Sequence, residues 1–178
     1  MELILLTGMP GAGKEEFLKI AKDRGYEIIR MGDIVRKQAE MVELDEEMNI
    51  GEFADKERRE HHEGIWADRT MSRIQSEKTI IDGLRSPEEL SIFRSELEKD
   101  APVVAIHSSP KTRFKRLKDR GREDAPQKRN EFHERDKREL EWGLGKIIAR
   151  ADHMIVNEGT LSEFHEKTRE FLKDFSEK

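Results

Sequence analysis

The sequence predicts a parallel α/β fold in three layers, and three observations support this prediction. Five short apolar runs are spaced along the chain, as is typical of strands covered on both faces. Between the runs lie segments with apolar residues at helical spacing, and a glycine-rich loop follows the first run directly. Because strand and helix alternate, we expect a parallel sheet with right-handed crossovers. No linker rich in glycine, serine or proline divides residues 1–178, which are predicted to form one domain.

The apolar runs predict strands at residues 3–6, 27–31, 79–81, 103–106 and 153–156. Ser86 and Ser109 each precede a proline, which is the arrangement of a capping residue before the first helical position. Each of the first three helices is expected to present an apolar face. These faces consist of Phe17, Leu18 and Ala21, of Ile34, Val35 and Ala39, and of Leu90, Phe93 and Leu97.

The last helix is predicted from a capping box formed by Thr160 and Glu163. Two polar intervals, at about 41–77 and 111–150, are interpreted as helical insertions on the same sheet. The face of the last helix that we expect to pack on the sheet comprises Leu161, Phe164, Thr168, Phe171 and Phe175.

Composition excludes several classes of protein. Charged residues make up 41% of the chain, but the apolar residues gather in dense runs, which argues against disorder. No apolar stretch approaches the roughly 20 residues that span a bilayer, and the first residues lack the features of a signal peptide, so we expect a cytoplasmic protein. The absence of cysteine excludes disulfides, thiolate nucleophiles and cysteine-based zinc sites, and the six histidines show no metal-ligand spacing.

Positive charge is concentrated in one segment. Residues 111–138 carry 12 basic and 6 acidic side chains, whereas the whole chain has a formal charge of −5. This segment is predicted to bind anions. The alternative is an exposed helix with internal ion pairs, such as Glu134 with Arg138 at helical spacing.

The glycine-rich loop fits the G-x-x-x-x-G-K pattern of a Walker A loop. Glycines allow successive N–H groups to point inward, the following helix adds its positive end, and the lysine reaches the β and γ phosphates of ATP. The residues of the loop are Gly8, Met9, Pro10, Gly11, Ala12, Gly13 and Lys14.

Glu15 departs from the usual pattern, in which a serine or threonine hydroxyl contacts Mg²⁺ at this position. The substitution weakens an interpretation as a GTPase or motor ATPase. A carboxylate in the first helical turn is favourable to the helix dipole, but it must either face away from the phosphates or help to hold the metal ion.

Further motifs accompany the loop. Residues 31–36 read Met-Gly-Asp-Ile-Val-Arg, and residues 79–85 read Thr-Ile-Ile-Asp-Gly-Leu-Arg. With the loop, these motifs resemble adenylate kinase and dephospho-coenzyme A kinase, and more closely an uncharacterised archaeal P-loop family related to both. The resemblance covers nearly the whole chain. It implies a P-loop NTPase fold of the nucleoside-monophosphate-kinase type, with strand order 2-3-1-4-5, a helical insertion at about 41–77 and a lid at about 111–150.

The resemblance also implies roles for individual residues. Arg36 and Arg85 would bind the acceptor, and Asp33 would be either a general base or a ligand to metal-bound water. A phosphate acceptor is already ionised at pH 7 and needs no base, so the acceptor decides between these roles. Asp82, at the carboxyl end of a predicted buried strand, is expected to contact Mg²⁺ or its waters.

An arginine-rich run resembles the lid that closes over the phosphates in these kinases. Guanidinium groups match the charge that spreads over the oxygens during phosphoryl transfer, and closure excludes water. Arg116, Arg120 and Arg135 are the expected lid residues, with Arg113 and Arg122 in the same run. The resemblance also indicates Gly51, Phe53 and Arg58 as the lining of an acceptor pocket. Trp66 and Trp142 are interpreted as packing residues.

These observations predict an enzyme that transfers the γ-phosphate of ATP, with Mg²⁺, to a nucleotide-like small molecule. A nucleotide-responsive ATP-binding protein without transfer is the first alternative. The second is an RNA- or ribosome-associated ATPase that uses the basic segment, in which Phe114 and Phe132 are the aromatic residues available for stacking. We expect no membrane partner and do not expect nucleic acid. The acceptor, the choice between ATP and GTP, and the oligomeric state stay open at this level.

Overall fold

The computed structural model describes residues 2–42, 48–97, 101–120 and 126–177. Its strands form one sheet in the order β2-β3-β1-β4-β5, and every neighbouring pair is parallel. The predicted strand order and fold class are therefore confirmed. The strands are β1 (Glu2–Thr7), β2 (Glu27–Arg30), β3 (Lys78–Asp82), β4 (Val103–His107) and β5 (His153–Val156).

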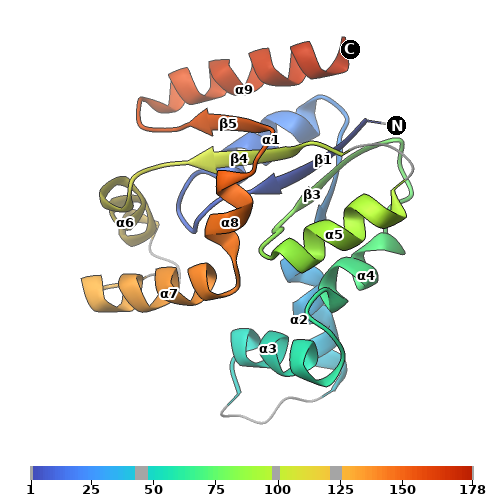
Figure 1. Cartoon of the computed structure of the whole chain (residues 1–178). Helices are drawn as coiled ribbons and strands as arrows, with labels where there is room; N and C mark the ends of the chain where they lie inside the picture. The colour runs from blue at the N-terminus through green and yellow to red at the C-terminus, as the bar shows by residue number, and fades with distance from the viewer. Residues whose placement is uncertain (1, 43–47, 98–100, 121–125, 178) are drawn as a thin grey trace.

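Side chains of β1 alternate between the two faces of the sheet, as the pleat requires. Leu3 and Leu5 belong to one apolar cluster, whereas Ile4 and Leu6 belong to the other. Helices α1 (Lys14–Asp23) and α9 (Leu161–Ser176) cover the second face, and α5 (Pro87–Glu96) and α8 (Leu144–Ala149) cover the first. Figure 1 shows these helices above and below the sheet, which gives the predicted three layers.

In the described part of the connection from β2 to β3, the helices are α2 (Met31–Met41), α3 (Ile50–Glu60) and α4 (Ile65–Met71). They extend the first apolar cluster, in which Trp66 is fully buried. The predicted strand 27–31 is one residue too long, because Met31 already begins α2. As a result, Gly32 and Asp33 lie in the first turn of a helix.

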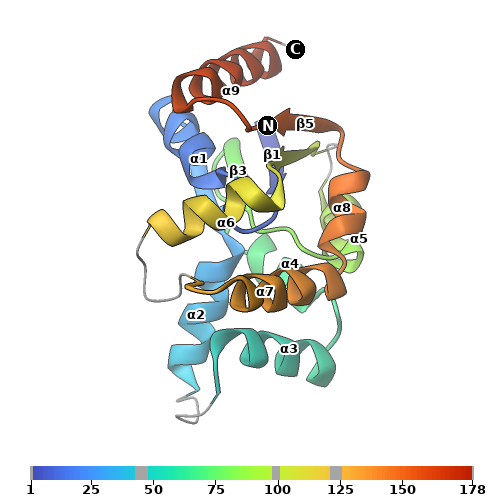
Figure 2. The same cartoon turned by 90° about the vertical axis from the view of Figure 1, so that its left-hand side faces the viewer.

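Helices α6 (Pro110–Asp119) and α7 (Arg129–Glu141) lie at the carboxyl end of the sheet. Figure 2 shows α6, α7 and α3 one below another, with α7 in the middle. Residues 121–125, between α6 and α7 in the sequence, lie outside the described residues, and with them Arg122 of the arginine-rich run. Within the described ranges, no helix has the length and hydrophobicity needed to cross a bilayer.

The predicted inner face of α9 is largely confirmed. Phe164 and Thr168 are buried, and Phe171 and Phe175 pack against the second cluster. The prediction for Leu161 was wrong, since 57% of this residue is exposed. It occupies the first helical position, one turn before Phe164, where α9 first enters the core.

Replacement of Phe164 tests this packing, with Leu161 on the same helix as the control. Phe164→Ala removes a large buried ring, so we expect it to lower the free energy of unfolding by about 3–5 kcal/mol. Leu161→Ala should change it by less than about 0.5 kcal/mol. Urea denaturation at 25 °C measures both values, and equal losses would contradict the assigned face.

Candidate functional site

The Walker A loop connects β1 to α1 and depends on its glycines. Gly8, Gly11 and Gly13 have φ angles of 147°, 82° and 112°, which favour glycine. A Cβ atom added at Gly13 would collide with the side-chain amide of Asn157, and one added at Gly8 would collide with a main-chain carbonyl. The backbone therefore turns tightly beside neighbouring segments and leads into the N-terminus of α1, where anions are favoured.

A cavity of about 250 Å³ lies over this loop. Nζ of Lys14 donates to the carbonyl of Gly8 at 2.8 Å and closes the loop beside the cavity. Met9 is buried and does not line this cavity. Asp33 and Arg116 do not line it either. The predicted residues that do line the cavity are Gly8, Pro10, Gly11, Ala12, Gly13, Lys14, Glu15, Arg36, Asp82, Arg85, Arg120 and Arg135.

The loop is supported from behind by the segment after β5. The buried side chain of Asn157 donates from Nδ2 to the carbonyl of Ala12 at 2.8 Å. Arg116 donates to Ser108 Oγ at 2.9 Å and to Asn157 Oδ1 at 3.2 Å. The structure thus places Arg116 in the support of the loop, whereas its predicted catalytic role over the phosphates stays a prediction.

Arg113 links the loop to both α6 and α7. Only 3% of this residue is exposed. Its guanidinium donates to the carbonyl of Pro10 at 3.1 Å and forms two bonds with the carboxylate of Asp136, at 2.8 and 2.5 Å. Sequence reasoning did not single out Arg113, because it is one of several arginines in a basic run and its partners are distant in sequence.

Asp82 ends β3 and lies in register with Leu6 of β1 and Arg30 of β2. Its side chain is buried, and Oδ1 has no hydrogen-bond partner among the described residues. Burial raises the pKa of the Asp82 carboxyl, although the positive charges of Lys14 and Arg85 act in the opposite direction. An unpartnered carboxylate oxygen beside a phosphate-binding loop fits Mg²⁺ or a metal-bound water, because Mg²⁺ prefers oxygen ligands.

Glu15 and Asp33, the other two carboxylates considered from the sequence, lie in different places. Glu15 lines the cavity and accepts a bond of 3.0 Å from Arg30, a residue that sequence reasoning missed. Asp33 pairs with Arg36 and is 58% exposed at its side chain. It lines a separate cavity on the outer side of α2, so its role as a base or metal ligand stays a prediction.

A second and larger cavity, of about 590 Å³, adjoins the first. Part of its wall is apolar and includes Val35, Ala54 and Trp66. Gly51 and Arg58 line it, whereas Phe53 packs in the core, and the identity of this cavity as an acceptor pocket stays a prediction. The residues that line both cavities, and so mark their junction, are Gly32, Arg36, Arg85, Arg135 and Glu139.

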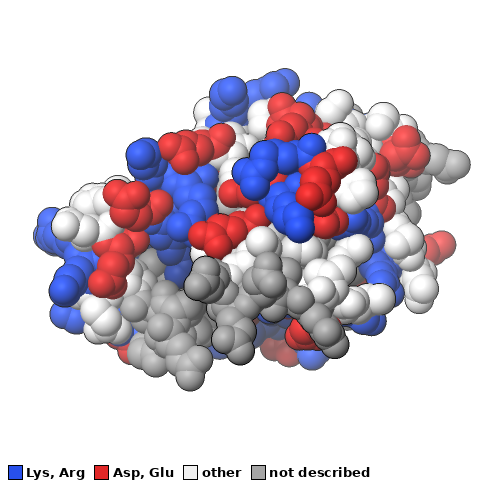
Figure 3. Space-filling view, turned by 90° about the horizontal axis from the view of Figure 1, so that it is seen from below, with Lys and Arg blue, Asp and Glu red and all other residues white. Residues whose placement is uncertain are grey.

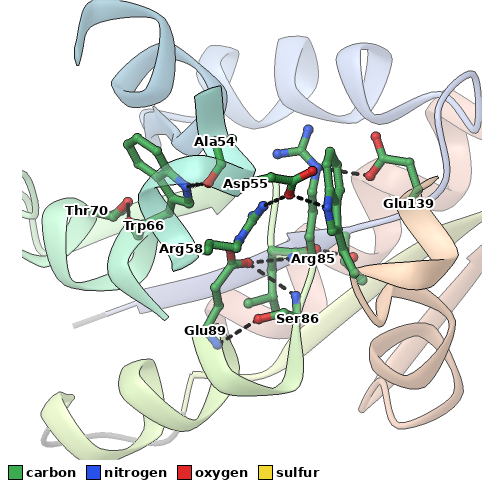
Figure 4. Close-up of polar contacts among 12 residues, drawn as sticks. Ala54, Asp55, Arg58, Trp66, Thr70, Arg85, Ser86, Glu89 and Glu139 are labelled. Atoms are coloured by element: carbon green, nitrogen blue, oxygen red, sulfur yellow. Dashed lines mark hydrogen bonds and ion pairs between the residues drawn. The ribbon is translucent and has the colours of Figure 1, made fainter. Parts of the chain in front are cut away.

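Arg85 belongs to a charged network in the wall of the second cavity (Figure 4). Its Nε donates to Glu139 at 3.0 Å, and its backbone N–H donates to Glu89 at 2.8 Å. Although burial acts to lower it, the pKa of Arg85 is raised by the charges of Glu139, Glu89 and Asp82. Glu139 was not predicted as a site residue, because nothing in its sequence neighbourhood shows that it reaches Arg85.

The same network continues into α3. Arg58 donates to Asp55 at 3.2 Å and to Glu89 at 3.1 Å, and its side chain is 5% exposed. Trp142, which follows α7, donates from Nε1 to Asp55 at 2.6 Å, and its ring lies 5.0 Å from the guanidinium carbon of Arg58. The network therefore joins α3, α5 and the end of α7.

The burial of Asp82 predicts a pH-dependent stability. Because folding raises the pKa of this carboxyl, ionised Asp82 lowers the free energy of unfolding at pH values above the folded-state pKa. Without nucleotide or metal, Asp82→Asn should therefore unfold at a higher urea concentration than the wild type at pH 7. This advantage should shrink as the pH falls through the folded-state pKa toward the ordinary value of 3.8.

Exposed Asp33 supplies the control for that measurement. Asp33→Asn should shift the free energy of unfolding by less than about 0.5 kcal/mol across the same pH range. An advantage of Asp82→Asn that is constant from pH 4 to pH 7 would contradict the assignment to ionisation.

Comparison with known proteins places the chain among P-loop proteins. The protein family described as "AAA domain" matches residues 7–133. UPF0200 protein Ta0179 of Thermoplasma acidophilum is 47% identical over 176 residues, which cover 97% of this chain and 96% of the relative. UPF0200 protein MK0400 of Methanopyrus kandleri is 47% identical over 178 residues, with 96% and 89% covered.

Solved structures show the same fold at low sequence identity. Shikimate kinase from Acinetobacter baumannii, in complex with shikimate, superposes with a TM-score of 0.63 at 16% identity, and the match covers 98% of this chain and 94% of the kinase. The resemblance to an archaeal P-loop family is confirmed by the relatives, and the fold by the solved structure. The chain therefore belongs to the UPF0200 family of archaeal proteins, and it carries an AAA domain.

Proposed function

We propose that this protein is a Mg²⁺-dependent phosphotransferase that moves the γ-phosphate of ATP onto a nucleotide-like small molecule. The observation that carries this proposal is the pair of adjoining cavities, one over the Walker A loop and one between α2, α3 and α7. Arginine side chains line their junction, where a phosphoryl group would pass between donor and acceptor.

The first cavity suits the phosphates of ATP. The loop N–H groups and the N-terminus of α1 supply positive potential, and Lys14 supplies a mobile charge. Asp82 would hold Mg²⁺, either directly or through water, and Glu15 lies in the same cavity. Bound Mg²⁺ would neutralise charge on the phosphates during transfer.

The second cavity suits an acceptor of nucleotide size. Its volume of about 590 Å³ falls in the range of small-molecule sites. Arg36 and Arg85 lie at the junction, whereas Val35, Ala54 and Trp66 supply apolar wall. This distribution favours a molecule with an anionic group at one end and an apolar ring system at the other.

The carboxylates favour an acceptor that carries a phosphate group. A hydroxyl acceptor requires a base, but Asp33 is outside the described lining of both cavities. Glu139, the carboxylate that lines both cavities, is bound to Arg85, and Glu89, Glu131 and Glu134 line the second cavity but not the first. A phosphate monoester needs no base because it is ionised at pH 7, so nucleoside monophosphates are the favoured acceptors over dephospho-coenzyme A.

A nucleotide-responsive protein without transfer is the second candidate. The Glu15–Arg30 ion pair supports it, because this pair occupies the position where other P-loops place a hydroxyl for Mg²⁺. The RNA-associated alternative has less support. Phe132 is buried and packs against Phe114 at 5.5 Å between ring centroids, and Figure 3 shows basic and acidic side chains interspersed over the face seen from below.

Transfer is tested with γ-labelled ATP and Mg²⁺ against nucleoside monophosphates, the matching nucleosides and dephospho-coenzyme A. We expect label on a monophosphate, and Lys14→Ala should reduce the rate by roughly 10²-fold or more because it removes charge from the transferring phosphate. Lys19→Ala is the control, since Lys19 lies on the same helix and is exposed.

Binding of a non-hydrolysable ATP analogue, measured by calorimetry, separates the candidates. Tight binding without transfer to any acceptor would favour the nucleotide-responsive protein. Unchanged binding by Lys14→Ala would show that the loop has been wrongly assigned as the phosphate site.

A further inference from the structure

Two residues at the end of α7, Glu139 and Trp142, contact Arg85 in the wall of the second cavity. We propose that Glu139 and Trp142 are positioning residues, which hold Arg85 as a preformed binding group for the phosphate of the acceptor. This inference rests on the proposed function in one respect only, namely that the second cavity receives the acceptor. Residues at the end of α7 would thus hold in place Arg85, which belongs to another segment of the chain.

The Nε atom of the Arg85 guanidinium is bound to the protein, whereas its two terminal nitrogens are available to a ligand. Glu139 binds Nε at 3.0 Å, and the ring of Trp142 lies 5.6 Å from the guanidinium carbon. Within the described residues, the two terminal nitrogens have no hydrogen-bond or ion-pair partner. The side chain is 31% exposed and lines both cavities. Two free N–H₂ groups at the junction match the bidentate geometry of a phosphate.

Glu139 fixes which nitrogens remain available. A carboxylate placed across the terminal nitrogens would compete with the ligand, but this one binds Nε and leaves the outer pair free. The side chain of Glu139 is only 10% exposed, so the bond is shielded from water. Fixing the rotamer of a long side chain before the ligand arrives lowers the entropy cost of binding.

Trp142 places its ring against two arginines with different roles. The terminal nitrogens of Arg58 donate to Asp55 and Glu89, and the side chain is almost fully buried, so these nitrogens are not available to a ligand. Arg85 is the one of these two arginines whose terminal nitrogens remain for a ligand. The bond from Trp142 to Asp55 also fixes the ring relative to α3.

This arrangement restricts the acceptor to molecules with an anionic group at the junction. A phosphate monoester would engage the outer nitrogens of Arg85, whereas a nucleoside would leave a charged group near the cavity without a partner. The nucleoside matching a good monophosphate acceptor should therefore bind far more weakly.

Steady-state kinetics with labelled ATP test the positioning role. Glu139→Gln keeps the size of the side chain but loses its charge, and we expect about a tenfold rise in the KM for the monophosphate, as for loss of one charged hydrogen bond. The KM for ATP should stay within about twofold of the wild-type value, since Glu139 is proposed to affect binding of the acceptor and not of ATP. Trp142→Leu should act like Glu139→Gln, and Trp142→Phe, which keeps an aromatic ring under Arg85, should lie closer to the wild type.

Glu57→Gln is the matched control. Glu57 also forms a partly buried ion pair with an arginine, Arg69, at 2.6 Å, but it lines neither cavity. If it raised the KM for the acceptor as much as Glu139→Gln, the effect would reflect general loss of an ion pair and the proposal would be wrong. Thermal unfolding of both variants shows whether they are comparably folded.

A second measurement does not need transfer. With the Walker A loop saturated by a non-hydrolysable ATP analogue and Mg²⁺, inorganic phosphate is titrated while tryptophan emission and heat are followed. The chain has two tryptophans, of which Trp66 is fully buried. We expect a saturable change in emission that is lost in Trp142→Phe, and about tenfold weaker phosphate binding in Glu139→Gln.

The two measurements separate this inference from the proposed function. Phosphate binding that depends on Glu139, without transfer to any acceptor, would support the positioning role and contradict the phosphotransferase. Transfer with an unchanged KM for the acceptor and unchanged phosphate affinity in Glu139→Gln would support the phosphotransferase and overturn the positioning role.

Discussion

The amide of Asn157 supports the part of the structure on which the nucleotide site depends. It donates to the carbonyl of Ala12 and lies so close to Gly13 that no side chain fits there. Gly13 is also the residue that precedes the first turn of α1. The direction of the loop N–H groups, the start of α1 and the shape of the first cavity all follow from this contact between two distant segments of the chain.

Strand order determines which residues meet around the loop. Because β1 pairs with β3 on one side, Asp82 emerges beside the Walker A loop, and β2 brings Arg30 next to Asp82. The pairing of β1 with β4 leads into Ser108 and α6, which support the loop from the other side. A parallel sheet thus gathers the donor site at its carboxyl edge, and the insertion between β2 and β3 supplies much of the second cavity.

Local patterns in the sequence predicted what depends on local structure. The loop and the burial of Asp82 follow from motifs and short apolar runs, whereas the strand order was implied by the resemblance to nucleotide kinases. The contacts of Arg113, Asn157, Glu139 and Trp142 could not be predicted this way, because each acts through a partner more than 20 residues away. Asp33 illustrates the reverse case, since a motif placed it in the site, whereas its position in the first turn of α2 directs it outward.

The bond between Arg113 and Asp136 limits how the cavities widen. It joins α7 to the carbonyl of Pro10 through a bidentate pair in which Arg113 is buried, and a buried charge that loses its partner costs about 3–5 kcal/mol. Fewer strong contacts join α3 to the end of α7, and one of them is the bond from Trp142 to Asp55. Because α3 is in turn held to α5 by the buried Arg58–Glu89 pair, displacement of either helix would break an ion pair, and both walls of the second cavity therefore stay in place when a ligand enters or leaves.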